Sequence, residues 1–411
     1  MALTTEWKDV WLLDGARTPF VDYNGDLARV SPIDLGIKAG RAVFARTGIS
    51  STDVGQVITG NMAQASFDTY MLPRHIGLYS GVPMETPAHM VQRVCGTGIE
   101  AISQAADSAE HGRADLVLCV GAESMSRNPV AAYTSRGGFR MGQVEFKDFL
   151  WEALLDPAAD VTMGGTAENL AQQYQLTRDD VDAFAVRSFE RAKAAQDSGF
   201  LGDEIEPVVN ETFDLDGYSS RQIRLPRGVD AVSSDSHIRP STLESLGKLR
   251  PAFGGVQTGG NSSGIVDGAA AVLVASGAYK NDTDRAPLAR IVSAASVGVP
   301  PEIMGIGPAP AIRAVLEQVG LGISDIDRFE INEAFGAQVL ACVRELGLDE
   351  EKLNVNGGAI AIGHPLGATG IRLSLTVARE LKRSGLRYGI ASACIGGGQG
   401  IAILLENPEA A

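Results

Sequence analysis

Hydrophobic runs alternate with amphipathic stretches along most of this chain. Continuous apolar runs occur at residues 10–13 and 116–120, residues 57–60 look like a further strand, and residues 32–46 and 98–111 have apolar positions at helical spacing. Such short apolar runs are typical of strands that are buried on both faces. Their alternation with helices predicts parallel sheets covered by helices.

The second half of the chain repeats this order of elements. Residues 291–293, 328–331 and 388–393 are predicted strands, and residues 310–319 and 370–383 are predicted helices. The chain is therefore predicted to contain two α/β units of similar order.

One pair of segments in the two halves aligns without gaps. Asp-Val-Gly-Gln-Val at residues 53–57 matches Asp-Ile-Asp-Arg-Phe at residues 325–329, and each segment follows a helix and a turn of glycine with isoleucine or leucine. This pattern is common in α/β proteins. It therefore suggests an internal repeat but leaves two unrelated βαβ units as an alternative.

The character of the sequence changes between about residues 125 and 265. Turn-forming residues become frequent, as in Arg-Gly-Gly at 136–138 and Asp-Leu-Asp-Gly at 214–217. We interpret this segment as an insertion into the first half. Between residues 221 and 250 the basic side chains are Arg221, Arg224, Arg227, Arg239, Lys248 and Arg250, against the acids Asp230, Asp235 and Glu244. This local excess of positive charge indicates either a binding surface for an anion or a solvated face.

Composition restricts the classes of function that are open to the chain. A length of 411 residues suits two or three domains. The net charge of −15 argues against a general affinity for nucleic acid or for an anionic membrane surface. The sequence has no stretch apolar enough to span a bilayer, no secretory signal at its start and no peroxisomal address at its end. We therefore expect a soluble cytoplasmic protein.

The four cysteines occur singly, at Cys95, Cys119, Cys342 and Cys394. The absence of Cys-x-x-Cys pairs argues against zinc ribbons, and we expect no bound metal. Cys95 differs from an ordinary buried thiol because it lies in a glycine-flanked turn before a predicted helix. Free backbone N–H groups and the helix dipole favour a thiolate there, and the thiolate is the nucleophile. A structural cysteine in a tight turn is the alternative.

Three further segments contain polar groups that suit catalysis. Only His364 of the five histidines lies in a glycine-rich turn before a helix, where an imidazole can accept a proton at neutral pH. Cys394 begins a glycine-rich run at the end of a predicted strand, where ligands bind in open sheets, although a phosphate-binding loop is the alternative. The amide of Asn332, also after a strand, can donate to an oxyanion or cap the next helix.

In combination these segments resemble the thiolase family, which comprises acetyl-CoA acetyltransferases and 3-ketoacyl-CoA thiolases. The resemblance runs nearly from end to end, and its last three motifs are highly specific in their order and spacing. The matching motifs lie at residues 15–19, 95–98, 121–126, 163–169, 248–251, 260–264, 332–335 (Asn-Glu-Ala-Phe), 363–365 (Gly-His-Pro) and 394–400 (Cys-Ile-Gly-Gly-Gly-Gln-Gly).

The resemblance implies an α/β fold of thiolase type. Two similar βαβαβαββ halves would pack as a five-layer αβαβα sandwich with an inserted loop domain. The N-terminal half would comprise residues 1–124 and be completed by residues 266–286. The loop domain that binds coenzyme A would comprise residues 125–265, and the C-terminal half residues 287–411.

The resemblance also implies an acyltransferase that works through an acyl-enzyme. Cys95 would take up the acyl group as a thioester, and His364 would accept its proton. Cys394 would move the proton at the α-carbon of the second acyl-CoA. Asn332 would hold a water in one oxyanion hole, and the N–H groups of Cys95 and Gly396 would form the other. The reaction would be the reversible condensation of two acetyl-CoA molecules, or the cleavage of 3-ketoacyl-CoA by coenzyme A.

Coenzyme A would be a substrate and product of this reaction, and no prosthetic group is expected. The positions that match coenzyme A contacts in the family are Arg239, Ser245, Ser263, Met163, Phe253 and Phe335. Thr162 stands where many members have histidine, which leaves the pantetheine contact open. A homodimer or homotetramer is expected, since residues 133–149 resemble the loop that joins dimers in tetrameric members.

Two other functions remain open at this point. A decarboxylating condensing enzyme of the same fold would share a nucleophilic cysteine but would use two histidines, or histidine and asparagine, so that Cys394 argues against it. A non-catalytic acyl-CoA-binding protein of thiolase shape would be expected to lose the cysteines or the histidine, and this chain retains Cys95, His364 and Cys394.

Overall fold

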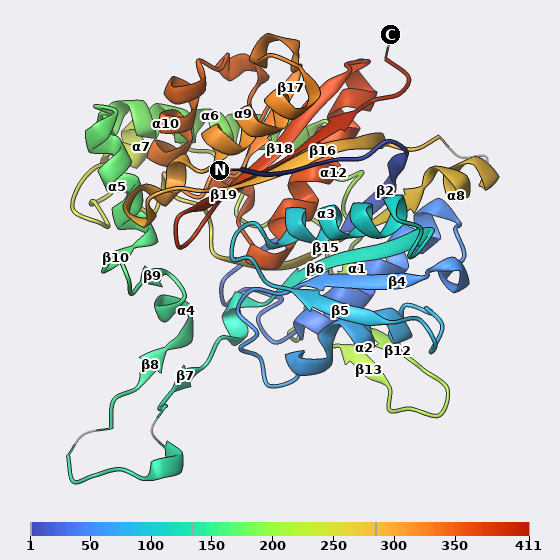
Figure 1. The fold of residues 1–411 in the computed structure, drawn as a ribbon. Helices are drawn as coiled ribbons and strands as arrows, with labels where there is room; N and C mark the ends of the chain where they lie inside the picture. The colour runs from blue at the N-terminus through green and yellow to red at the C-terminus, as the bar shows by residue number, and fades with distance from the viewer. Residues whose placement is uncertain (1, 134, 143, 284–285, 411) are drawn as a thin grey trace.

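The computed structural model describes residues 2–133, 135–142, 144–283 and 286–410. The residues outside this description are 1, 134, 143, 284, 285 and 411. Residues 134 and 143 belong to the expected assembly loop, and the other four belong to the expected halves. Within the described residues, an extended sheet of 11 strands forms the centre of the molecule, and helices cover it (Figure 1). None of the described helices is long and apolar enough to cross a membrane.

The first half of the chain forms one side of this sheet, in the order βαβαβαββ. Its elements are β2 (Val10–Arg17), α1 (Pro32–Thr47), β4 (Gln56–Gly60), α2 (Leu72–Tyr79), β5 (Ala88–Val91), α3 (Thr97–Glu110), β6 (Leu116–Glu123) and β15 (Val266–Ser276). Three shorter elements accompany it, namely β1 (Ala2–Glu6), β3 (Val21–Asp22) and α8 (Gly277–Asp282).

The second half follows the same plan. Its elements are β16 (Ala289–Gly298), α9 (Pro308–Val319), β17 (Arg328–Ile331), α10 (Gly336–Leu346), α11 (Ala359–Ile362), α12 (Leu366–Ser384), β18 (Tyr388–Ile395) and β19 (Gln399–Glu406). In place of a third strand, Leu353 forms a single parallel bridge with Phe329 of β17.

The two halves share one strand order, which confirms the internal repeat. The first half reads β5-β4-β6-β15-β2 across the sheet, and the second reads Leu353, then β17-β18-β19-β16. When the strands of each half are numbered in chain order, their order across the sheet is third, second, fourth, fifth and first in both halves. The alternative of two unrelated βαβ units is therefore wrong.

The prediction of parallel sheets is wrong in part, because the sheets are mixed. β4 runs parallel to β5 and β6, and β17 runs parallel to β18, but β15 and β19 are antiparallel to both of their neighbours. All 11 residues of β15 are buried. An apolar run indicates that a strand is buried on both faces, but it does not indicate whether the strand is parallel or antiparallel to its neighbours.

Local signals explain where the helices begin and end. Ser31 caps α1 by accepting a hydrogen bond from the N–H of Ile33, and a proline follows at the first helical position. Helices α1, α9 and α12 end at Gly48, Gly320 and Gly385, which have φ angles of 63°, 70° and 63°. All the strands and helices predicted from the sequence are present, although several strands are longer than predicted.

The arrangement of five layers follows from where the helices pack. α3 and α12 lie against each other and against strands of both halves, whereas α1 and α2 cover the outer face of the first half and α9 that of the second. A Cβ on Gly98 of α3 would lie 2.6 Å from the backbone of α12, and one on Gly370 would lie 2.3 Å from the backbone of α3. This contact, which only glycine permits, brings the first turns of the two central helices together.

The inserted segment forms several small sheets, two longer helices (α5 and α6) and two short ones (α4 and α7). Its elements are β7 (Val130–Ala131), β8 (Lys147–Asp148), α4 (Phe149–Glu152), β9 (Leu155–Asp156), β10 (Val161–Thr162), α5 (Met163–Gln173), α6 (Arg178–Asp197), β11 (Val208–Val209), β12 (Glu211–Phe213), β13 (Arg221–Ile223), β14 (Ala231–Val232) and α7 (Leu243–Gly247). α5 and α6 pack against α10 of the second half. The part around β7 and β8 extends from the body as an arm (Figure 1).

Candidate active site

Cys95 lies in the turn between β5 and α3. The preceding residue, Val94, has a φ of 43°, in a region that β-branched residues rarely adopt. Thr97 stabilises the turn, since its hydroxyl donates to the carbonyl of Val94 at 2.6 Å and accepts from the N–H of Arg93 at 2.9 Å. Backbone strain of this kind is found where a side chain must be aimed for function. Cys95 is thereby held at the start of a central helix, 7% exposed.

Cys394 lies beside Cys95 at the end of β18. The backbone N–H of Gly396 lies close enough to the sulfur of Cys95 to lower the pKa of that thiol, and a negative charge on Cys95 would raise the pKa of Cys394. A Cβ on Gly96 would lie 2.5 Å from Ile395, so the two turns touch. The glycine run after Cys394 links two antiparallel strands. No helix follows it, and the interpretation as a phosphate-binding loop is therefore wrong.

His364 and Asn332 meet at the ends of two other elements. His364 precedes α12, and Asn332 follows β17. Nδ2 of Asn332 lies 3.3 Å from Nε2 of His364, and both side chains are buried. Among the described residues, Oδ1 of Asn332 has no hydrogen-bond partner. Helix α10 begins only at Gly336 and has no side-chain cap, so the interpretation of Asn332 as a helix cap is wrong.

The hydrogen bonds around His364 determine its tautomer. Nδ1 lies 2.6 Å from the hydroxyl of Thr369, which donates to the carbonyl of Pro365 at 3.1 Å. Because the hydroxyl has one hydrogen, it accepts from Nδ1–H. Nε2 is then unprotonated and accepts from the amide of Asn332. The nitrogen on the side of Asn332 is therefore the one that can take up a proton.

Apolar packing joins the two cysteines to the histidine and asparagine. Leu366, two residues beyond His364, belongs to the same buried cluster as Cys95. Ala334, two residues beyond Asn332, belongs to the same buried cluster as Cys394. Four segments that are remote in sequence thus converge at the meeting point of α3, α12 and β18.

Burial dominates the protonation of the two reactive groups. It raises the pKa of the Cys95 thiol to about 11, although hydrogen bonds from the backbone N–H groups of Gly396 and of Cys95 itself lower it. Burial and the positive charge of Arg372 lower the pKa of His364 to about 3. The expectation that the helix N-terminus favours a thiolate is therefore wrong for the free protein, because loss of water penalises the charged sulfur more than these hydrogen bonds favour it.

Alkylation of Cys95 is expected to depend steeply on pH. With a pKa of about 11, only ~10⁻⁴ of the thiol is ionised at pH 7, so the rate with iodoacetamide should rise about tenfold per pH unit from pH 7 to pH 9. The rate is measured by mass spectrometry of the peptide that contains Cys95, with a Cys394→Ala variant to separate the two sulfurs. A rate that reaches its plateau near pH 7 would contradict the raised pKa.

Four of the positions expected to contact coenzyme A lie close to these groups. The rings of Phe253 and Phe335 are 6.0 Å apart, edge to face. The ring of Phe253 packs on Gly164, next to Met163, whose sulfur lies 3.3 Å from the Cβ position of Gly396. The backbone of Ser263 donates to Ala334 at 3.0 Å. Met163, Phe253, Phe335 and Ser263 therefore surround the turns that hold Cys394 and Asn332.

The other two positions, Arg239 and Ser245, are exposed on the inserted segment. The guanidinium of Arg239 lies 3.0 Å from Nε2 of His237 and 4.8 Å from the centre of the Phe189 ring. Ser245 bonds to Thr242, the N-cap of α7. Thr162, where a histidine was expected, caps α5 by accepting from the N–H of Gly165 at 3.1 Å, so this departure has a structural role at the helix start.

Sequence reasoning missed two residues that position the site. One is Thr369, which fixes the imidazole of His364. The other is Glu123, whose buried carboxylate accepts from the N–H groups of Met62 at 2.8 Å and Gly367 at 3.0 Å. It thereby fastens the start of α12 to the loop after β4, and burial raises its pKa to about 7. Glu123 stands within the motif at residues 121–126, and Thr369 lies four residues beyond the Gly-His-Pro motif, but nothing in their local sequence indicates these partners.

Comparison with known protein families defines the class of this enzyme. The model described as the N-terminal domain of thiolase matches residues 10–278, and the model of the C-terminal domain matches residues 285–407. Together they describe an acyltransferase built from the two halves seen in the fold. The chain belongs to the thiolase family.

Individual members of the family are similar to this protein over nearly the whole chain. It is 41% identical to the human mitochondrial 3-ketoacyl-CoA thiolase, across 97% of this chain and 98% of that protein. It is 40% identical to a beta-ketothiolase of Cupriavidus necator, across 97% of this chain and 99% of that protein. The solved structure of the human enzyme in complex with CoA superposes with a TM-score of 0.90, at 41% identity and 97% and 98% coverage of the two chains.

Proposed function

We propose that this chain catalyses the reversible transfer of acyl groups between coenzyme A thioesters. The reaction is the condensation of two acetyl-CoA molecules to acetoacetyl-CoA, or the cleavage of 3-ketoacyl-CoA by coenzyme A. The observation that carries the proposal is the convergence of two buried cysteines, Cys95 and Cys394, with the His364–Asn332 pair: the turns of the two cysteines touch, and buried apolar clusters join them to the segments of His364 and Asn332.

In the first half-reaction, the sulfur of Cys95 attacks the thioester carbonyl. Its proton passes to Nε2 of His364, which the Thr369 contact keeps free to accept it. The N–H groups of Cys95 and Gly396 donate to the oxyanion that forms on the acyl group. The sulfur of coenzyme A takes the proton of Cys394 and leaves as the thiol, so that Cys394 becomes a thiolate and the acyl group remains on Cys95 as a thioester. Loss of one donor from such a site typically lowers the rate by ~10²–10³.

In the second half-reaction, Cys394 takes a proton from the α-carbon of a second acyl-CoA. The resulting carbanion attacks the carbonyl carbon of acyl-Cys95, the bond to sulfur breaks, and the sulfur of Cys95 takes back its proton from His364. The thioester oxygen of the second substrate gains charge in this step. We place it beside Nε2 of His364 and a water held by Asn332, since Oδ1 of Asn332 is buried and has no hydrogen-bond partner in the part of the chain that the structure describes.

We propose that residues 125–265 form the loop domain that holds coenzyme A, between an N-terminal half (1–124 with 266–286) and a C-terminal half (287–411). Met163 and Phe253 belong to this segment and lie against Gly396 and Phe335. They are assigned to the pantetheine arm, together with Ser263. Arg239 and Ser245, which are exposed further along the segment, are assigned to the nucleotide end.

Thiolysis of 3-ketoacyl-CoA substrates tests this function. Mixing the protein with acetoacetyl-CoA and coenzyme A should consume free thiol and form acetyl-CoA, followed by absorbance and chromatography. A series of acyl lengths then gives the substrate preference from kcat/KM. Absence of turnover with every length would favour a non-catalytic acyl-CoA-binding protein. Turnover of malonyl-CoA without turnover of acetyl-CoA would favour a decarboxylating enzyme.

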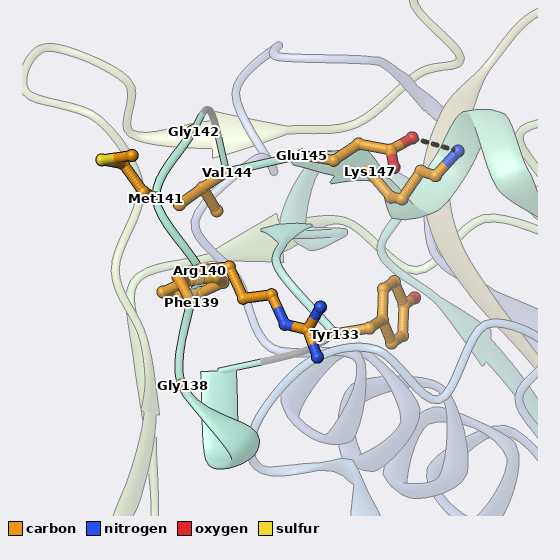
Figure 2. Close-up of a pocket in the computed structure, with 9 residues that line it drawn as sticks. All are labelled: Tyr133, Gly138, Phe139, Arg140, Met141, Gly142, Val144, Glu145 and Lys147. Carbon is orange, nitrogen blue, oxygen red and sulfur yellow. Dashed lines mark ion pairs between the residues drawn. The ribbon is translucent and has the colours of Figure 1, made fainter.

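We propose that the chain forms a homodimer or homotetramer in the cytoplasm. The arm around β7 and β8 presents exposed Tyr133, Phe139 and Met141 to solvent, beside the ion pair of Glu145 and Lys147 (Figure 2). Apolar side chains of this number on a projecting arm suit contact with another subunit. Light scattering measures the number of subunits in the assembly.

Cell fractionation determines the compartment in which the protein is found. This test is informative because several relatives are named as mitochondrial.

A further inference from the structure

A second cleft opens between the first half and the inserted segment, with a volume of about 910 Å³. Its walls come from residues between 24 and 34, from Phe67 and Asp68, from Arg127, and from residues between 222 and 227 after β13. None of the residues assigned above to acyl transfer or to coenzyme A lines it.

The walls of this cleft present positive charge that carboxylates do not neutralise. Four arginines line it, namely Arg29, Arg127, Arg224 and Arg227. Among the described residues, the guanidinium groups of Arg29 and Arg227 have no hydrogen bond or ion pair, and that of Arg224 bonds only to the neutral amide of Gln222 at 3.0 Å. Three exposed guanidinium groups thus face one space in a chain with a net charge of −15.

The carboxylates at the bottom of the cleft are already paired. Arg221 donates to Asp34 at 2.6 Å and to Asp68 at 3.3 Å, and Arg127 lies 3.4 Å from Asp68. Asp26, at the rim, is the remaining acidic group in the lining. These pairs hold the base of the cleft rigid and leave its open side with net positive charge.

An aromatic surface completes the lining. Phe67 is 82% exposed, and the guanidinium of Arg127 lies 5.1 Å from the centre of its ring. A flat ring beside cations suits a flat heterocycle attached to an anionic group.

We propose that this cleft binds a phosphorylated small molecule with two or more negative charges, through Arg29, Arg224 and Arg227. Guanidinium groups recognise phosphate oxygens through paired N–H donors, and three of them that lack carboxylate partners match a diphosphate better than a single carboxylate. The ligand is either a free inorganic diphosphate or the diphosphate of a nucleotide, whose base would lie on Phe67. Binding here does not depend on the acyl-transfer chemistry at Cys95.

Isothermal titration calorimetry of the full chain tests the cleft, with inorganic pyrophosphate and with adenosine diphosphate as separate probes. The variant Arg224→Glu/Arg227→Glu should weaken pyrophosphate binding about tenfold or more, because two attractive contacts become repulsive. The matched control is Lys8→Glu/Arg113→Glu, which makes the same change of charge on exposed residues outside the cleft and outside the segment assigned to coenzyme A. This control should change the affinity by less than about twofold, since its charges are screened by salt.

The substitution Phe67→Ala distinguishes the two sources of the diphosphate. If the natural ligand is a nucleotide, this substitution should lower the affinity for adenosine diphosphate and leave the affinity for pyrophosphate unchanged. If the natural ligand is inorganic diphosphate, it should change neither affinity. Thermal unfolding of each variant, compared with the unmodified chain, verifies that these surface changes leave the fold intact. The proposal is overturned if pyrophosphate gives no saturable binding, or if the double variant in the cleft and the control double variant have the same affinity for pyrophosphate.

Discussion

Replacing Cys95 with serine is expected to abolish the acyl-enzyme and to lower the rate of thiolysis by ~10³ or more. A serine hydroxyl ionises far less readily than a thiol, and the base available here is weak. The imidazole of His364 is oriented by the neutral hydroxyl of Thr369 and not by a carboxylate. Mass spectrometry of the protein after incubation with acetyl-CoA measures the acyl-enzyme directly.

The matched control for this experiment is Cys119→Ala. Cys119 is also a fully buried thiol, but it lies in the middle of β6 and bonds only to the carbonyl of Ala101 at 3.7 Å. Its loss should lower the free energy of unfolding by about 1 kcal/mol and leave acyl transfer intact. If the serine variant at position 95 still carried an acyl group on that residue, or if turnover persisted at the original rate, Cys95 would not be the nucleophile.

Replacing Cys394 with alanine is expected to separate the two half-reactions. Cys95 should still become acylated from acetyl-CoA, because its contact with the N–H of Gly396 does not involve the side chain of Cys394. Condensation should fall by ~10²–10⁴, the range typical for the loss of a group that moves a proton in the transition state. Acylation is followed by mass spectrometry, and condensation by the appearance of acetoacetyl-CoA.

Cys342→Ala serves as the neighbouring control. This buried cysteine of α10 also interacts electrostatically with Cys394, but its sulfur donates to the carbonyl of Gly305 at 3.3 Å. Condensation by that variant should stay within a few-fold of the original rate. Full condensation activity in the Cys394→Ala variant would require another group to move the α-proton, and the assigned roles would be wrong.

Much of the fold was predictable because its signals are local. The strands at residues 10–13 and 116–120 are short apolar runs, and α1 has both its cap and its terminal glycine in the sequence. The repeat was visible because the two halves bury the same faces and therefore need the same pattern. The direction of β15 was not predictable, since antiparallel and parallel strands that are buried on both faces have the same composition.

The sequence by itself determined which residue types stand at the turns: a cysteine before α3, a histidine before α12 and a cysteine at the end of β18. Only the tertiary structure decided what those groups experience. Gly98 and Gly370 bring the two helices into contact, Thr369 selects the tautomer of His364, and burial moves the pKa of Cys95 in the direction opposite to the helix dipole. Periodicity and capping depend on neighbours within a few residues, whereas desolvation and hydrogen bonding depend on atoms that the folded chain supplies from remote segments.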